Sequence, residues 1–138
     1  MENCIFCKIA NGEIPSATLF EDEDFRVILD LAPASKGHAL IIPKKHYRNL
    51  YDLDKNLAGK VLIIAQEMAH RLKEGLGCTG VNIVQNNEAP AGQTVFHFHM
   101  HLIPRVKGDG VGIKWKSGKL SDADKEEIMG KLEKRKNK

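Results

Sequence analysis

Residues 92–104 read GQTVFHFHMHLIP, a stretch in which apolar residues and histidines alternate. Successive side chains of a β-strand point to opposite faces of the sheet. The alternation therefore predicts a strand over residues 95–103 that buries one apolar face and carries three histidines on the other. The apolar face holds Phe96, Phe98, Met100 and Leu102, and the opposite face holds His97, His99 and His101.

Four further short runs of apolar and β-branched residues predict strands at residues 17–20, 25–30, 39–42 and 81–85. Only the polar residues 21–24 separate the first two runs, so we expect a hairpin and an antiparallel sheet.

Two helices are predicted. Apolar residues from Leu57 to Leu72 recur at spacings of three and four, after Asp54 as N-cap and before Gly75 and Gly77 as stops. A second helix begins at Ser121, which forms a capping-box pattern with Asp124. The predicted fold class is α+β, with a five-stranded antiparallel sheet and the long and C-terminal helices packed on one face.

The composition fits a single globular domain over residues 1–138, because 42% of the 138 residues are hydrophobic and 28% are charged. This length excludes a two-domain enzyme, and three cysteines exclude a secreted disulfide scaffold. The N-terminus has neither a basic start nor a long apolar run. We therefore expect no signal peptide, no membrane partner and a cytoplasmic location.

The net charge of +3 comes from the tail, where residues 107–138 hold 10 Lys and Arg against 6 Asp and Glu. Acidic residues interleave with the basic ones, which is typical of a solvated helix. We expect no nucleic-acid partner.

Three titratable rings in register favour a chemical role over a packing role. Neighbouring rings start about 6.5 Å apart and the outer pair about 13 Å apart, whereas a zinc–nitrogen bond is about 2 Å. All three therefore cannot bind one ion. Two alternate histidines can, so a metal hydrolase with zinc at His99 and His101 remains open beside a nucleophilic histidine.

The pair Cys4-x-x-Cys7 supplies half of a tetrahedral metal site. The six histidines and Cys78 can supply the other two ligands. A thioredoxin-like redox pair is less favoured, because no strand precedes the cysteines and Asn11-Gly12 soon interrupts any helix after them.

The loop at residues 85–94 is rich in amide side chains and turn formers. It is either a plain hairpin connection or, since it leads into the histidines, a set of donors to phosphate oxygens. Gly37-His38, at the start of an apolar strand, can bring a fourth histidine to the same place.

With these residues assembled, the chain resembles the histidine triad (HIT) family, whose motif is three histidines separated by single apolar residues. Residues 97–103 match that motif fully, and the likeness extends from Cys4 to about Arg105. It is closest to the Hint-like branch of nucleoside phosphoramidases and nucleotidyl hydrolases, and looks like the bacterial members that carry zinc. The further matching positions are Asp30, Gly37-His38, Pro43, Asn86 and Gly92-Gln93-Thr94.

The resemblance implies a hydrolase that cleaves the bond at the α-phosphorus of purine nucleoside monophosphate derivatives, namely phosphoramidates and adenylates. His99 would attack phosphorus and form a nucleotidyl-histidine, which water then hydrolyses. Other implied roles are phosphate contacts from His101 and Thr94, orientation by His38, ribose contacts from Asp30, and positions for Leu31 beside the base, Asn86 near the ribose-phosphate and Gln93 near the leaving group.

The resemblance also implies a structural zinc held by Cys4, Cys7, His46 and His97, no catalytic metal, and a symmetric homodimer. The chain departs from the Hint pattern in residues 107–138, a variable C-terminal extension that contains Trp115 without the adjacent proline. Trp115 either caps the leaving-group side of the site or packs elsewhere.

Two other functions remain open. The same histidines can hydrolyse dinucleoside polyphosphates, or the protein can be a nucleotide-binding regulatory module with vestigial catalysis. The complete set of His38, His97, His99 and His101 counts against the regulatory module.

Overall fold

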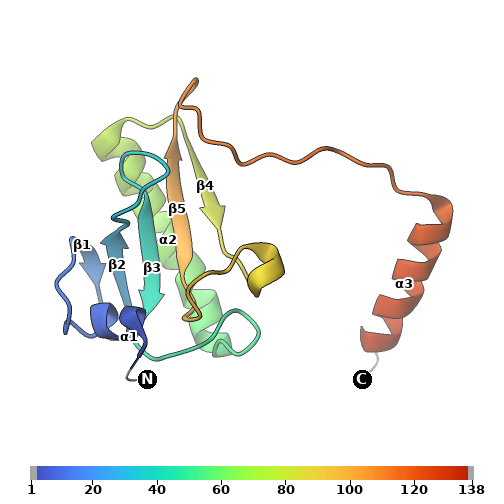
Figure 1. The fold of residues 1–138 in the computed structure, drawn as a ribbon, viewed down its shortest axis with the longest axis horizontal. Helices are drawn as coiled ribbons and strands as arrows, with labels where there is room; N and C mark the ends of the chain where they lie inside the picture. The colour runs from blue at the N-terminus through green and yellow to red at the C-terminus, as the bar shows by residue number, and fades with distance from the viewer. Residues whose placement is uncertain (1–2, 137–138) are drawn as a thin grey trace.

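The computed structural model describes residues 3–136, which form an α+β fold around a five-stranded antiparallel sheet in the order β1-β2-β3-β5-β4 (Figure 1). This confirms the predicted fold class. The strands are β1 (Thr18–Glu21), β2 (Phe25–Leu29), β3 (Ala39–Pro43), β4 (Gly80–Val84) and β5 (Met100–Arg105). The helices are α1 (Ile5–Ala10), α2 (Lys55–Leu76) and α3 (Asp122–Lys136), with a short 3₁₀ turn, η1 (Ala89–Ala91).

The turn and cap residues act as the sequence predicts, except Gly75, which lies within α2 and does not end it. In the β1–β2 hairpin, Asp22 accepts hydrogen bonds from the backbone N–H groups of Asp24 and Phe25 at 2.9 and 2.8 Å. Asp54 caps the N-terminus of α2, and Gly77 ends the helix in the left-handed conformation at φ +70°.

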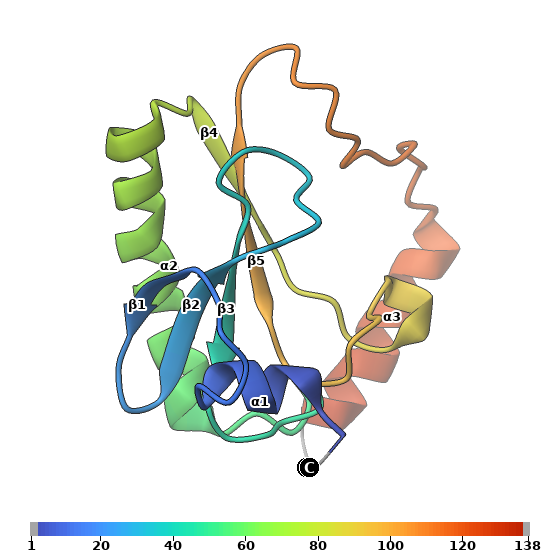
Figure 2. The ribbon, with the colours of Figure 1, turned by 60° about the vertical axis from the view of Figure 1, so that its left-hand side comes forward.

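The two faces of the sheet are covered by α2 and α1. The prediction that the long and C-terminal helices share one face is wrong, because α3 lies away from the sheet. α2 packs on one face, and the unpredicted short helix α1 packs on the other (Figure 2). The α1 face is apolar through Ala10, Ile28, Leu40 and Ile42. The α2 face buries Phe25, Val27, Ala39, Ile41, Leu53, Val61, Ile64, Ala65, Met68, Leu72, Cys78, Phe98 and Leu102.

The histidine strand is shorter than predicted, because β5 begins at Met100 and not at residue 95. β3 pairs with β5 only as far as Ile41 opposite Met100. Beyond that point the Pro43 carbonyl accepts a hydrogen bond from the His97 ring at 2.9 Å, where a strand partner would donate a backbone N–H. The Phe98 N–H instead donates to the carbonyl of Tyr47 at 2.7 Å.

The alternation of side chains nevertheless persists through most of this segment. Phe98 and Leu102 lie in the core of the α2 face, with Met100 packed against it. Phe96 was also predicted to be core, and that prediction is wrong, since its side chain is exposed under the Arg48 guanidinium, 4.3 Å from the ring centre.

α3 lies away from the sheet at the end of an extended arm (Figure 1). Ser121 accepts a hydrogen bond from the Asp124 N–H at its start, as the capping pattern predicts. Trp115 lies on the arm with 83% of its surface exposed, so in this chain it does not pack. Among residues 3–136, no helix has the length and hydrophobicity that crossing a bilayer requires.

Candidate active site

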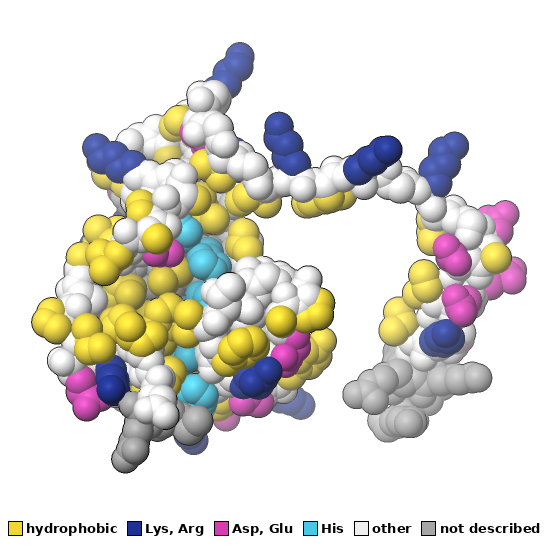
Figure 3. Space-filling model, in the orientation of Figure 1, with side chains coloured by type: hydrophobic (Ala, Val, Ile, Leu, Met, Phe, Trp, Pro, Cys, Tyr) yellow, Lys and Arg dark blue, Asp and Glu magenta, His cyan; other side chains and the backbone are white. Residues whose placement is uncertain are grey.

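The strand register gathers the histidines on the α1 face of the sheet. Leu40 lies opposite His101, so His38, which directly precedes β3 and lies two residues before Leu40, shares its face. His99 and His38 are buried, and His101 is partly exposed. In Figure 3 the histidine side chains form a band down the middle of the molecule, with apolar side chains beside it.

The His99 ring has one fixed tautomer. Its Nδ1 lies 2.8 Å from the carbonyl oxygen of His97. Because a carbonyl can only accept, Nδ1 carries the proton and donates it. The lone pair is therefore on Nε2, the atom that a nucleophilic histidine needs to have free.

A chain of hydrogen bonds fixes the protons of His38 and His101. The backbone N–H of Ala34 can only donate, and it lies 2.9 Å from His38 Nδ1. His38 then carries its proton on Nε2, which donates to His101 Nδ1 at 2.9 Å. The remaining nitrogen of His101, Nε2, therefore carries a proton and is available as a donor to a bound anion.

The histidines of this site are neutral at pH 7. Burial lowers the pKa of His99 and of His38 below the ordinary value, although Asp30 acts in the opposite direction on both. Burial, with the neighbouring His99 and His38, lowers the pKa of His101 to about 4. Neutral rings are consistent with a nucleophile at Nε2 of His99 and a fixed donor at Nε2 of His101.

A cavity of about 710 Å³ lies in front of His99 and His101. Its walls are largely apolar, which suits a purine ring and a sugar more than a fully charged ligand. The Phe6 ring stands edge-on to the His99 ring, with centroids 5.0 Å apart. α1 contributes Ile5, Phe6 and Ile9 to the wall.

Three of the five predicted nucleotide-binding residues line this cavity: Asp30, Leu31 and Thr94. One carboxylate oxygen of Asp30 accepts a hydrogen bond from the Ala32 N–H at 2.9 Å, and the other oxygen lies 3.6 Å from His38 Nε2. Asn86 lies outside the lining of the cavity, beside Gly92.

Gln93 is buried, and the protein itself satisfies its amide. Its oxygen accepts from the Glu88 N–H at 2.7 Å and from Asn49 at 3.2 Å. Its nitrogen donates to the carbonyl oxygens of Arg48 and Val95 at 2.7 and 3.1 Å. In this structure Gln93 holds the loop together, and its contact with a leaving group stays a prediction.

The four predicted metal ligands converge. The ligand atoms of Cys4, Cys7, His46 and His97 all lie within 4.8 Å of one another, and three sulfur–nitrogen pairs are 3.3 to 3.4 Å apart. A tetrahedral zinc ion places neighbouring ligand atoms about 3.3 to 3.8 Å apart, so this set fits zinc.

The proton positions and the thiol chemistry agree with that fit. His97 Nε2 donates to the Pro43 carbonyl, which leaves the Nδ1 lone pair facing the sulfurs. Burial and the neighbouring Cys4 raise the pKa of the Cys7 thiol to about 11. A cation among these ligands would stabilise the thiolate that the protein alone disfavours.

Asp30, His38 and His101 form a second group with metal-binding side chains. Here the tautomers argue against an ion, because the Ala34 N–H leaves the proton of His38 on Nε2, the atom that would face the metal. The group fits a proton-ordered hydrogen-bond chain better than a metal site. This geometry also counts against a catalytic zinc that uses His101.

Sequence reasoning missed the contribution of α1 to the cavity. The signal was present, because Phe6, Ile9 and Ala10 follow Cys4 at helical spacing. The turn formers Asn11-Gly12 argue against a long helix here, but the six residues of α1 form one that contains Cys7 and also lines the cavity. The Ala34 N–H carries no sequence signal.

A family model of the HIT domain matches residues 11–108. "Protein hit" of Bacillus subtilis is 46% identical over 117 residues, which are 84% of this chain and 81% of that protein. Adenosine 5'-monophosphoramidase hnt1 of Schizosaccharomyces pombe is 36% identical over 135 residues, covering 94% of this chain and 98% of that protein.

Solved structures are also similar to this chain. SMU.412c from Streptococcus mutans superposes with a TM-score of 0.93 at 38% identity, covering 98% of this chain and 86% of that one. A zinc-bound histidine triad family protein from Mycobacterium smegmatis superposes with a TM-score of 0.77 at 33% identity, covering 97% and 98% of the two chains.

Proposed function

Since the chain belongs to the HIT family, we propose that it cleaves the bond at the α-phosphorus of purine nucleoside phosphoramidates and adenylates through a nucleotidyl-histidine. Family membership supports a nucleotide hydrolase in general. The observation that carries the finer proposal is the ordered set of tautomers, which leaves a lone pair on His99 and a donor on His101 at one cavity.

In the first step His99 Nε2 attacks phosphorus, and the bond to the leaving group breaks. The leaving group departs with the electron pair of that bond and takes a proton from solvent, and the water that attacks in the second step returns a proton to solvent. The ring keeps its Nδ1 proton and becomes positively charged, and the His97 carbonyl at 2.8 Å stabilises that charge. His101 donates from Nε2 to a phosphate oxygen. Water then attacks the same phosphorus, releases the nucleoside monophosphate and returns His99 to its neutral form.

The rest of the cavity binds the nucleoside. The purine contacts the apolar wall of Phe6, Ile9 and Leu31, and the free carboxylate oxygen of Asp30 accepts hydrogen bonds from the ribose hydroxyls. Thr94 lines the same cavity and donates to the phosphate. These contacts fit adenine and guanine equally.

The Cys4, Cys7, His46 and His97 set holds a structural zinc in this proposal. Four protein ligands close the coordination shell, so the ion stabilises the fold and supplies no activated water. Zinc would tie α1, which bears the purine wall, to the segment that leads into His99.

We also propose a symmetric homodimer. β4 is an edge strand with unpaired backbone groups, and the neighbouring face of α2 exposes Leu62 and Ile63 at 58% each. Ile83 of β4 is exposed beside them. Pairing two copies at this edge satisfies the backbone and covers the apolar side chains.

The proposed reaction is tested with adenosine 5'-phosphoramidate as substrate. His99→Ala should abolish turnover, and mass spectrometry of the wild-type protein with a slow substrate should find one added nucleotide on a peptide that contains His99. His70→Ala is the matched control, because His70 lies exposed on α2 outside the cavity. Wild-type turnover by His99→Ala, or an adduct on another residue, would refute the proposal.

A further inference from the structure

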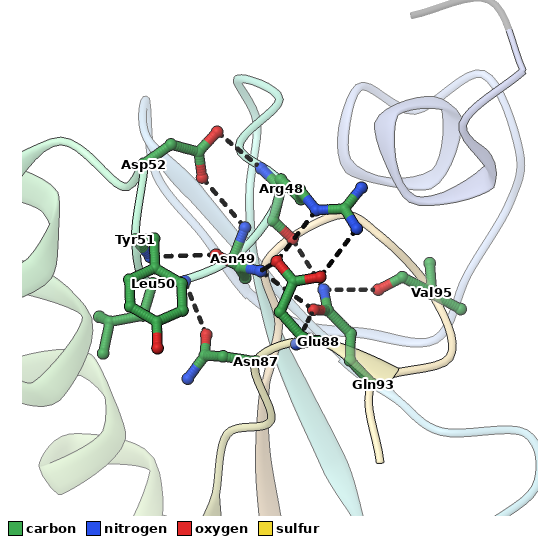
Figure 4. A network of polar contacts seen from close by, with 9 residues as sticks. All are labelled: Arg48, Asn49, Leu50, Tyr51, Asp52, Asn87, Glu88, Gln93 and Val95. Carbon is green, nitrogen blue, oxygen red and sulfur yellow. Dashed lines mark hydrogen bonds and ion pairs between the residues drawn. The ribbon is translucent and has the colours of Figure 1, made fainter. Parts of the chain in front are cut away.

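Two loops that flank the active site are joined by a compact polar network. Residues 48–52 follow the predicted metal ligand His46, and residues 87–95 contain Thr94 and lead into His97 (Figure 4). Arg48 donates two hydrogen bonds to the Glu88 carboxylate, at 2.8 and 3.2 Å. Asn49, which is 1% exposed, donates a third to Glu88 at 2.8 Å.

Glu88 has an unusual backbone. Within residues 3–136 it is the one non-glycine residue with a positive φ, at +74°. Side chains with a Cβ rarely adopt this conformation, so it persists only when the surroundings hold it. Arg48 and then Asn49 lower the pKa of Glu88 to about 2, so the carboxylate remains ionised and paired throughout the physiological range.

The backbone of Glu88 determines where Thr94 lies. Its carbonyl accepts hydrogen bonds from the N–H groups of Ala91 and Gln93 at 3.1 and 3.2 Å, which closes the turn η1. Its N–H donates to the Gln93 side chain, which in turn donates to the Val95 carbonyl. Thr94 is thus held between two residues that are both bonded into this network.

We propose that Arg48 and Glu88 are positioning residues for the phosphate of the substrate. Their ion pair holds Glu88 in its positive-φ conformation, and this conformation fixes the turn that presents Thr94 to the cavity. The Arg48 guanidinium, stacked on Phe96 at 4.3 Å, anchors the other end of the same loop. This inference rests on the proposed function, because it assumes that Thr94 meets a nucleotide phosphate.

A comparison of AMP with adenosine isolates this role, since the two ligands differ only by the phosphate. Isothermal titration should give a ratio of AMP affinity to adenosine affinity that falls roughly tenfold in Glu88→Ala and in Arg48→Ala, the effect of losing one hydrogen bond to a charged group. Adenosine affinity should stay at the wild-type value, because neither Arg48 nor Glu88 lines the cavity that would hold the nucleoside.

Three further variants sharpen the result. Glu88→Gly should retain more of the AMP preference than Glu88→Ala, because glycine adopts φ +74° without strain. Asp109→Ala is the matched control: it removes another bidentate arginine pair, with Arg105, at the far end of β5. It should leave the ratio unchanged. Arg48→Lys carries the same test if an alanine variant fails to fold, because lysine keeps the charge and loses the paired geometry.

An unchanged ratio in both alanine variants overturns the inference. So does an equal loss of AMP and adenosine affinity, which would indicate a general effect on the fold. A Glu88→Gly variant as impaired as Glu88→Ala would overturn the role given to the backbone. Wild-type protein that prefers AMP no more than adenosine would instead contradict the proposed function.

Discussion

Replacement of His101 by Asn should make the stability of the protein less sensitive to acid. The Asn oxygen can take the place of His101 Nδ1 as the acceptor of the His38 Nε2 proton, so the hydrogen-bond chain is retained. The substitution removes a titrating group from a site where burial, with His99 and His38, lowers its pKa to about 4.

The sign and size follow from the difference between the folded and unfolded proteins. In the unfolded chain the pKa of His101 is near 6.5, so between pH 6.5 and about 4 the unfolded state binds a proton that the folded state does not. The free energy of unfolding therefore falls as the pH is lowered through this window. A pKa difference of this size corresponds to about 3 kcal/mol, and we expect 2 to 3 kcal/mol because the ring is partly exposed to water.

Urea unfolding at a series of pH values from 7.5 to 4.5 measures this effect. Between these limits the wild-type protein should lose about 2 kcal/mol more stability than His101→Asn. Release of a metal at low pH affects both proteins equally and cancels in the comparison. His38 keeps its lowered pKa in both, since burial is the main cause. Parallel stability curves for the two proteins would refute the assignment of a neutral, partly buried His101.

Three other outcomes follow from the structure. Cys7→Ser should lose the zinc and lower the melting temperature, and one zinc per chain by elemental analysis of this variant would contradict the proposed site. Gly37→Ala should reduce the free energy of unfolding by about 1 to 3 kcal/mol in urea, because φ is +91° and the new Cβ would overlap Leu76 Cδ1. Gly59→Ala, with open space around it, is the control and should not destabilise. Leu62→Glu should convert the dimer to a monomer by light scattering, and an unchanged mass would count against the α2–β4 interface.

Much of the fold is predictable because local patterns and packing agree. The spacing of the apolar residues from Leu57 to Leu72 predicts α2 almost to its ends, and the polar turn at residues 21–24 predicts the first hairpin. The alternation at Phe98 and Leu102 gives the buried face of β5. These elements bury one face against the core, so their periodicity is visible in the sequence.

The structure differs from the sequence-based prediction mainly where a side chain makes a hydrogen bond that a backbone group makes in a regular strand. The His97 ring donates a hydrogen bond to the Pro43 carbonyl. β5 therefore starts later than predicted, and Phe96 is exposed. α1 shows helical spacing over only six residues, and the turn formers Asn11-Gly12 follow it at once. The family likeness assigns Gln93 to the leaving group, but two of its four hydrogen bonds go to Arg48 and Asn49, which are 45 and 44 residues away. No local sequence pattern reports such contacts.

His97 serves the predicted metal site with its side chain and the nucleophile with its main chain. The bond that orients His99 comes from the carbonyl oxygen of residue 97, which every amino acid possesses. Substitutions at position 97 can therefore change or discard the metal while the nucleophile keeps its orientation, provided that the backbone stays in place. In evolutionary terms, a lineage with this architecture can exchange its metal ligands and retain its chemistry, so the two traits are free to diverge.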